Sequence, residues 1–181
     1  MVVGLPNKVT IGFLIQARLG SERLPGKVLM PLPSFSSKCV LSIIIEQLNS
    51  IPFKKKIIVL TTKNKVDNKI IEFCKNNDVS YYRGSEKNVF SRFIDVIDQN
   101  NFNIVVRITG DNPIINTSAL VKLIKSHIKK NADYSSTVNL PLGLNLELFN
   151  PKSLLFYKEK TLTNYEKEHV TIVLKSDLSI S

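Results

Sequence analysis

The chain has 181 residues, of which 43% are hydrophobic and 22% charged, and its formal net charge is +10 at pH 7. These values are typical of one globular domain and exclude a disordered or fibrous chain. We therefore expect a single domain over residues 1–181. Two cysteines, Cys39 and Cys74, are too few for a disulfide scaffold, and with two histidines and no Cys-x-x-Cys pair a zinc site is not expected.

The charge and the hydropathy pattern also limit the classes of partner that we expect. No apolar run approaches the roughly 18 residues needed to cross a bilayer, and the N-terminal residues lack the features of a secretory signal, so we expect a cytoplasmic protein with no membrane partner. The positive charge indicates either solvated lysines, as at 54–56 and 129–130, or attraction for a polyanion. No segment interleaves basic and aromatic residues as RNA-binding sheets do, so nucleic acid is not an expected partner.

Strands and helices alternate along the first two thirds of the chain. Short apolar runs predict strands at 9–16, 56–62 and 103–108, and the segment 79–83, whose two tyrosines could face either way, is a further strand candidate. Recurrent apolar positions predict helices at 37–50, 66–77, 85–97 and 117–128. The expected N-caps are Ser36 or Ser37, Ser85 and Thr117. This alternation predicts an α/β sheet with helices on both faces, whose ligands bind at the carboxyl ends of the strands.

The last third of the chain has a looser pattern. It predicts shorter strands at 134–138 and 143–149, a helix that begins at Pro151, and another helix over 165–175. No repeat or linker marks a second domain.

The loop 16–27, which follows the first predicted strand, has the composition of an anion site. Its cations and glycines are Arg18, Gly20, Arg23, Gly26 and Lys27. Glycine lets backbone N–H groups approach an anion, and the cations offset the charge of several phosphates. The loop is not a Walker A motif, because five residues separate its glycines and its lysine precedes Val, and it lacks the Gly-x-Gly-x-x-Gly dinucleotide fingerprint. The alternative is a surface loop whose cations pair with carboxylates.

A second loop, 109–113, follows the strand at 103–108 and contains Asp111. A carboxylate in this position either closes an Asx turn or faces the first loop as a metal ligand.

Five sequence blocks resemble the acylneuraminate-type cytidylyltransferases, specifically the branch named for spore-coat polysaccharide biosynthesis protein F. They occur in the family's order at 15–29, 83–92, 106–113, 143–147 and 165–171. The resemblance implies a three-layer nucleotide-diphospho-sugar transferase fold, similar to glycosyltransferase A, with a mixed, mainly parallel central sheet. It also implies a Mg²⁺-dependent transfer of CMP from CTP to a sugar, typically an acidic one, with release of pyrophosphate, in surface polysaccharide biosynthesis.

Mapped onto this sequence, the resemblance implies roles for individual residues. Those expected to contact CTP are Ala17, Arg18, Gly20, Ser21, Arg23, Lys27, Ser85 and Arg107. The expected catalytic residues are Arg18, Lys27 and Asp111, because the cations and a magnesium ion on Asp111 would stabilise the charge that moves to the leaving pyrophosphate. Glu147 is a further candidate ligand of the metal.

The sequence also departs from the family pattern. Asn145 and Leu142 stand where the family usually has aspartates, Asn88 stands where an acidic residue is common, and we expect the domain to be shortened at its C-terminus. A degenerate, non-catalytic nucleotide-binding member of the family is therefore the alternative function, and a homodimer stays open. His169 has either an active-site or a structural hydrogen-bonding role, and we favour the second.

Overall fold

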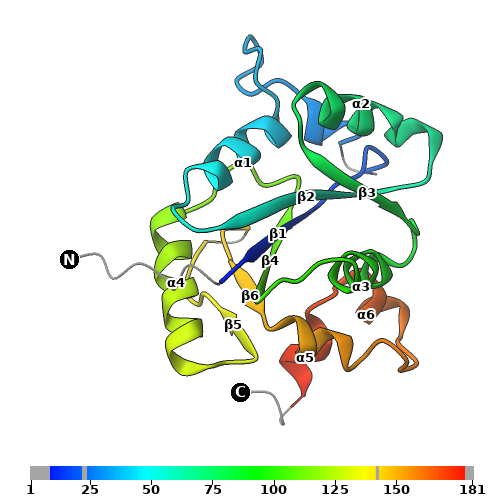
Figure 1. The fold of residues 1–181 in the computed structure, drawn as a ribbon. Helices are drawn as coiled ribbons and strands as arrows, with labels where there is room; N and C mark the ends of the chain where they lie inside the picture. Colours follow the sequence, from blue (N-terminus) through cyan, green and yellow to red (C-terminus); the bar gives the residue numbers. More distant parts are fainter. Residues whose placement is uncertain (1–8, 22–23, 142, 178–181) are drawn as a thin grey trace.

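The computed structural model describes residues 9–21, 24–141 and 143–177, and in these ranges the chain forms a three-layer α/β structure (Figure 1). The strands are β1 (Ile11–Gln16), β2 (Lys55–Thr62), β3 (Ser80–Gly84), β4 (Ile104–Thr109), β5 (Tyr134–Ser136) and β6 (Glu147–Phe149). The helices are α1 (Val40–Asn49), α2 (Asn68–Asn76), α3 (Val89–Asp98), α4 (Thr117–Lys130), α5 (Pro151–Leu155), α6 (Asn164–Glu168) and α7 (Ile172–Ser176). Two single-turn 3-10 helices are η1 (Lys27–Leu29) and η2 (Lys65–Asp67).

The strands form one sheet in the order β3-β2-β1-β4-β6-β5. Strands β3, β2, β1 and β4 are parallel, whereas β6 runs antiparallel to both β4 and β5. The prediction of a mixed, mainly parallel sheet is therefore confirmed. Because β1 and β4 are neighbours with Gln16 opposite Thr109, the loops that follow them leave the same edge of the sheet side by side.

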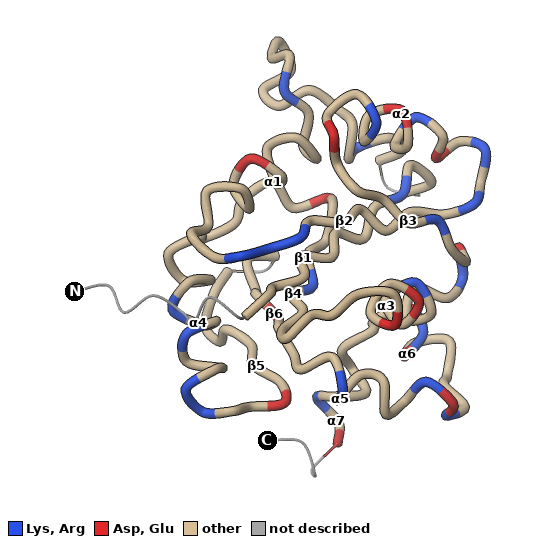
Figure 2. Tube along the Cα trace, in the orientation of Figure 1, with Lys and Arg blue, Asp and Glu red and all other residues tan. Residues whose placement is uncertain are grey.

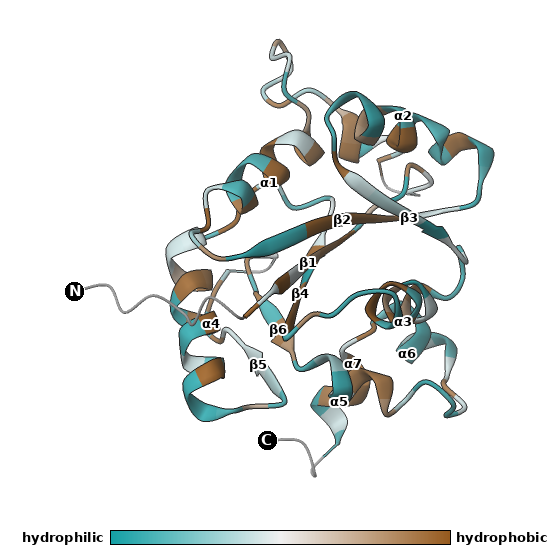
Figure 3. Cartoon of the chain, viewed as in Figure 1, coloured by the Kyte–Doolittle hydropathy of each residue, from teal (hydrophilic) through white to brown (hydrophobic). Residues whose placement is uncertain are grey.

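Alternate side chains of the central strands enter two separate cores. Phe13 and Ile15 of β1 pack in the core that contains α1, α2 and α4, whereas Leu14 packs in the core that contains α3, α5 and α7. Figure 3 shows the same pattern, with hydrophobic central strands and helices that are hydrophobic on one face. The continuous apolar runs of the sequence thus supply both faces of one sheet, as expected for buried parallel strands.

The three predicted N-caps are wrong. Asn88, not Ser85, caps α3 by accepting the N–H of Ser91, and Ser85 instead accepts the N–H of Asn88. Asn116, not Thr117, caps α4 by accepting the N–H of Ala119. In both cases an asparagine carboxamide oxygen reaches the free N–H groups of the first turn.

The first predicted cap and the last predicted helix also differ from the structure. Helix α1 begins after Cys39, later than a cap at Ser36 or Ser37 requires. The helix expected over 165–175 is two short helices, α6 and α7, because Val170 between them has a φ of +25°, outside the helical region. The strands expected at 134–138 and 143–149 are shortened to three residues each.

Lys and Arg lie along several elements, among them α2, α4 and the start of β2 (Figure 2). The charge is thus spread over the chain, as solvated lysines would spread it. Among the described residues, no helix combines the length and the apolar composition that a membrane span requires.

Candidate active site

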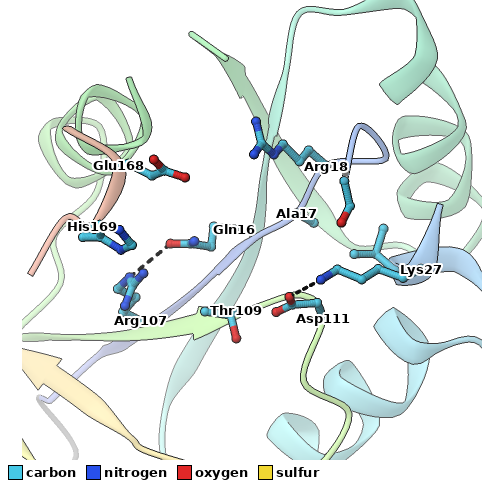
Figure 4. A pocket seen from close by; sticks show the side chains of 11 residues that line it. Gln16, Ala17, Arg18, Lys27, Arg107, Thr109, Asp111, Glu168 and His169 are labelled. Carbon is cyan, nitrogen blue, oxygen red and sulfur yellow. Dashed lines mark hydrogen bonds and ion pairs between the residues drawn. The ribbon is translucent and has the colours of Figure 1, made fainter. Parts of the chain in front are cut away.

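A cavity of about 630 Å³ lies at the carboxyl edge of the sheet, between the loop after β1 and the loop after β4. Its lining residues are Gln16, Ala17, Arg18, Ser21, Lys27, Val28, Arg107, Thr109, Asp111, Glu168 and His169. Figure 4 shows Lys27 and Asp111 on one side and Arg107, Glu168 and His169 on the other, with Gln16 between them. Six of the residues expected to contact CTP or act in catalysis therefore meet in one cavity: Ala17, Arg18, Ser21, Lys27, Arg107 and Asp111.

The other residues that the resemblance assigns to CTP or metal binding lie elsewhere. Gly20 and Ser85 are exposed and do not line this cavity. Glu147 lines a different cavity of about 190 Å³, behind Arg107, together with Asn145. Arg23 and Leu142 lie outside the described residues.

The two loops are joined through their backbones. The N–H of Gly110 donates to the carbonyl oxygen of Gln16 at 2.8 Å. A Cβ added to Gly110 would lie 2.9 Å from both this oxygen and the Cβ of Ala17, so only glycine allows such a close approach. The relative position of Lys27 and Asp111 is thus set by the sheet and by this contact.

Leu19 is the centre of the first loop. Its carbonyl oxygen accepts the N–H groups of Ser21 and Gly26, both at 2.9 Å, and its N–H donates to Asp67 Oδ1 at 2.8 Å. Gly26 has a φ of +76°, which favours glycine, and leads directly into η1 and Lys27. Asp67, which is 1% exposed, therefore anchors the loop from within the core, although nothing in its local sequence indicates this role.

Lys27 and Asp111 form an ion pair with Nζ and Oδ2 2.5 Å apart. Burial acts to raise the pKa of Asp111, but the hydrogen bond and charge of Lys27 and a hydrogen bond with Thr109 outweigh it and leave the pKa below its usual value. The Asx turn in this loop is formed by Asn112 rather than Asp111, because Asn112 Oδ1 accepts the N–H of Ile114 at 3.3 Å. Asp111 is thus an ionised carboxylate at the cavity surface.

This carboxylate has the chemistry of a magnesium ligand, since Mg²⁺ prefers oxygen donors and takes one or two carboxylates together with phosphate oxygens. Within the described part of the chain, no three His, Cys, Asp or Glu side chains cluster as a metal site. A metal ion on Asp111 would therefore draw its other ligands from a bound phosphate and water.

The opposite wall is formed by Arg107, by the C-terminal end of α6 and by the residue that follows it. Arg107 Nε donates to Gln16 Oε1 at 3.0 Å, and its Nη1 lies 2.8 Å from Glu147 Oε2. Glu168 and His169 line the cavity beside it, and the His169 ring packs against the Tyr165 ring, tilted by 54°, with 4.4 Å between centroids. His169 thus lines the cavity, whereas the sequence favours a structural hydrogen-bonding role for it.

A second cavity of about 450 Å³ adjoins the first and shares Gln16, Ala17, Arg18 and Glu168 with it. It is also lined by Arg92, which is 2% exposed and donates from Nη1 to the carbonyl oxygen of Leu60. Arg92 Nε has no hydrogen-bond partner among the described residues. Burial, with the charge of Arg18, lowers the pKa of Arg92 to about 10, so it is still a cation at neutral pH. Apart from its place in the block at 83–92, no local pattern in the sequence indicates this buried donor.

Comparison with known proteins then assigns the family. The family model described as "Cytidylyltransferase" matches residues 12–180, and the chain belongs to this family. A solved cytidylyltransferase from Leptospira borgpetersenii is 30% identical with a TM-score of 0.85, over 94% of this chain and 73% of that one. The predicted nucleotidyltransferase fold is therefore confirmed.

Two relatives match over most of this chain. The spore coat polysaccharide biosynthesis protein SpsF of Bacillus subtilis is 33% identical over 169 residues, and an uncharacterized protein of Methanocaldococcus jannaschii is 40% identical over 158 residues. The matches cover 91% and 87% of this chain, but 69% and 64% of the respective relatives. The chain thus spans about two thirds of their length.

Proposed function

We propose that the protein binds CTP with Mg²⁺ and transfers CMP to a hydroxyl group of an acidic sugar, releasing pyrophosphate, in surface polysaccharide biosynthesis. One observation carries the proposal: Lys27 and Asp111, from two separate loops, meet beside Arg18 in one cavity of a chain that belongs to the cytidylyltransferase family. The sugar class rests on the resemblance to acylneuraminate-type enzymes. The cytoplasm, where CTP is available, is the proposed compartment, and a homodimer stays a prediction.

In this proposal the triphosphate lies against the loop after β1. Arg18, Ser21 and Lys27 face the cavity there, and Arg23 belongs to the same proposed set. Arginine can hold phosphate oxygens with two donors and lysine acts as a point charge, so together they suit a chain of phosphates. The loop backbone at Ala17 and Gly20 would lie close to the nucleotide.

The nucleoside would occupy the adjoining cavity beside Arg92. The free Nε of this buried side chain suits an acceptor oxygen of a nucleobase, because an unpaired buried donor is costly. A Cβ on Gly84 would lie 2.6 Å from Arg92 Cγ, so the glycine of the 84–86 turn provides the space for Arg92. The close approach of Gly84 to Arg92, rather than any contact of Ser85, supports a role for this turn in shaping the proposed nucleoside pocket.

Asp111 is the proposed ligand of Mg²⁺, which would neutralise phosphate charge as pyrophosphate leaves. Lys27 holds the Asp111 carboxylate ionised and is itself placed to bind phosphate. The attacking sugar would approach from the side of Glu168 and His169, either of which is placed to accept the hydroxyl proton. Glu147 stays a prediction as a metal ligand, and its surroundings favour another role.

A non-catalytic nucleotide-binding protein is the second candidate function. It is favoured by Asn145, which lines the small cavity behind Arg107 in a block where the family usually has an aspartate. This candidate retains CTP binding and lacks transfer.

Pyrophosphate release from CTP and Mg²⁺ in the presence of a panel of nonulosonic acids tests the proposal. We expect release by the wild type and by Lys129→Ala, an exposed control at the end of α4, and a loss of at least tenfold in Lys27→Ala. The expected size follows from a charged hydrogen bond, which contributes about 1.5–3 kcal/mol. CTP binding without release would support the second candidate, and absence of both would refute the two candidates together.

A further inference from the structure

We propose that Glu147 is a positioning residue whose buried carboxylate holds Arg107 and the segment 168–171 in place as one wall of the cavity. The inference rests on the proposed function, because it assigns this wall to the sugar acceptor. It also gives Glu147 a role other than the metal ligand, and Arg107 a role other than the CTP contact, that the resemblance implies.

Glu147 collects donors from four different parts of the chain. Arg107 Nη1 of β4 and Thr171 Oγ1 each lie 2.8 Å from Oε2, and the Tyr134 hydroxyl of β5 lies 3.2 Å from Oε1. Lys175 of α7 forms an ion pair with Oε1. A carboxylate has about four acceptor positions, so the two oxygens are fully engaged. A metal ion on Glu147 would have to displace these donors.

The first consequence concerns Arg107, whose side chain is 14% exposed. Glu147 holds one end of its planar guanidinium and Gln16 holds another. Two partners on different donors fix the orientation of the guanidinium plane more firmly than one does. Arg107 therefore reaches the cavity in a set orientation, and part of its charge is offset by Glu147.

The second consequence concerns the segment between α6 and α7. Glu168 and His169 line the cavity, and Thr171, which bonds to Glu147, follows two residues later. Between them Val170 is fully buried at a φ of +25°, a conformation that a β-branched residue rarely adopts. Such strain persists only where the surroundings impose it.

Two anchors act on this strained segment. One is the burial of Val170 in the core that contains α3, and the other is the hydrogen bond from Thr171 to Glu147. Thr171 is 1% exposed, so no solvent competes for its hydroxyl. Loss of this bond should let the segment relax and move Glu168 and His169 away from their places in the wall.

Hydrogen exchange of the amides of residues 168–171 and the Mg²⁺ requirement for CTP binding together test this inference. We would compare the wild type with Glu147→Gln, Thr171→Val and Glu46→Gln, the last being an exposed control on α1. Thr171→Val removes one hydrogen bond, keeps the side-chain shape and leaves every charge paired, so it tests the same link if Glu147→Gln does not fold.

We expect exchange at least tenfold faster at these amides in both Glu147→Gln and Thr171→Val, and no change in Glu46→Gln. The Mg²⁺ concentration that half-saturates CTP binding should stay within about twofold of the wild-type value. Unchanged exchange, or a tenfold higher Mg²⁺ requirement in Glu147→Gln, would overturn the inference. If the wild type does not bind CTP, the proposed function fails, whereas the exchange result still decides whether Glu147 holds this wall.

Discussion

Replacing Glu147 by Gln should change how the free energy of unfolding depends on pH. Burial acts to raise the pKa of Glu147, but a hydrogen bond from Lys175, the charge of Arg107 and a hydrogen bond from Thr171 outweigh it and lower the pKa from 4.5 to about 2. The Tyr134 hydroxyl also faces this carboxylate. The ionised form is thus favoured in the folded state.

The shift gives the size of the effect. A folded-state pKa of about 2 against 4.5 in the unfolded chain corresponds to about 3 kcal/mol of stability. Because the pKa is depressed by folding, this stability is present above about pH 4.5 and is lost as the pH falls through about 2. The same linkage relation puts about 2 kcal/mol of the loss between pH 7 and pH 3.

Urea unfolding of the wild type and Glu147→Gln at pH 7 and pH 3 measures the stability that the ionised Glu147 carboxylate contributes. The variant should be less stable at pH 7, because it leaves Arg107 and Lys175 without their buried counter-charge. Its deficit should shrink by about 2 kcal/mol at pH 3, where this carboxyl group is protonated in the unfolded wild type but still mostly ionised in the folded protein. Glu46→Gln, a surface control, should have the same free energy of unfolding as the wild type at both pH 7 and pH 3. A deficit that stays constant between pH 7 and pH 3 would refute the argument.

Three further substitutions test the fold and the loops. Phe93→Ala empties a fully buried site in the core around α3 and should cost about 3–5 kcal/mol in urea unfolding; a cost below 1 kcal/mol would contradict this packing. Gly110→Ala should weaken CTP binding at least tenfold, because its Cβ would meet Ala17 at 2.9 Å, and unchanged calorimetric affinity would show that the loops adjust freely. Asp67→Ala leaves the N–H of Leu19 without its acceptor and should cost about 1–3 kcal/mol and speed exchange of that amide; slow exchange in the variant would argue against the anchor.

Three of the four parallel strands were predictable because β1, β2 and β4 each contain a short continuous apolar run. Such a run predicts burial on both faces, and β1, β2 and β4 have this environment. The motif blocks then indicated that the loops after β1 and β4 belong to one site, and Lys27 and Asp111 do lie in one cavity.

The anchors of the site were not predictable from local patterns. Asp67 reaches Leu19 across 48 positions, and Glu147 reaches Arg107 across 40, so no periodicity or spacing connects either pair. The helix expected over 165–175 failed for a related reason. No local sequence signal marks Val170 as a break, and only the packed structure holds that residue at positive φ.

The central claim is that the loop after β1 and Asp111 together bind CTP with Mg²⁺. Calorimetric titration of the wild type, Asp111→Asn and Asp98→Asn with CTP, with and without Mg²⁺, tests it most directly. Asp98 is an exposed carboxylate paired with Lys158 and serves as the matched control. We predict Mg²⁺-dependent binding by the wild type and the control, and a loss of at least tenfold in Asp111→Asn. Equal affinity in all three proteins, or affinity that does not depend on Mg²⁺, would contradict the claim.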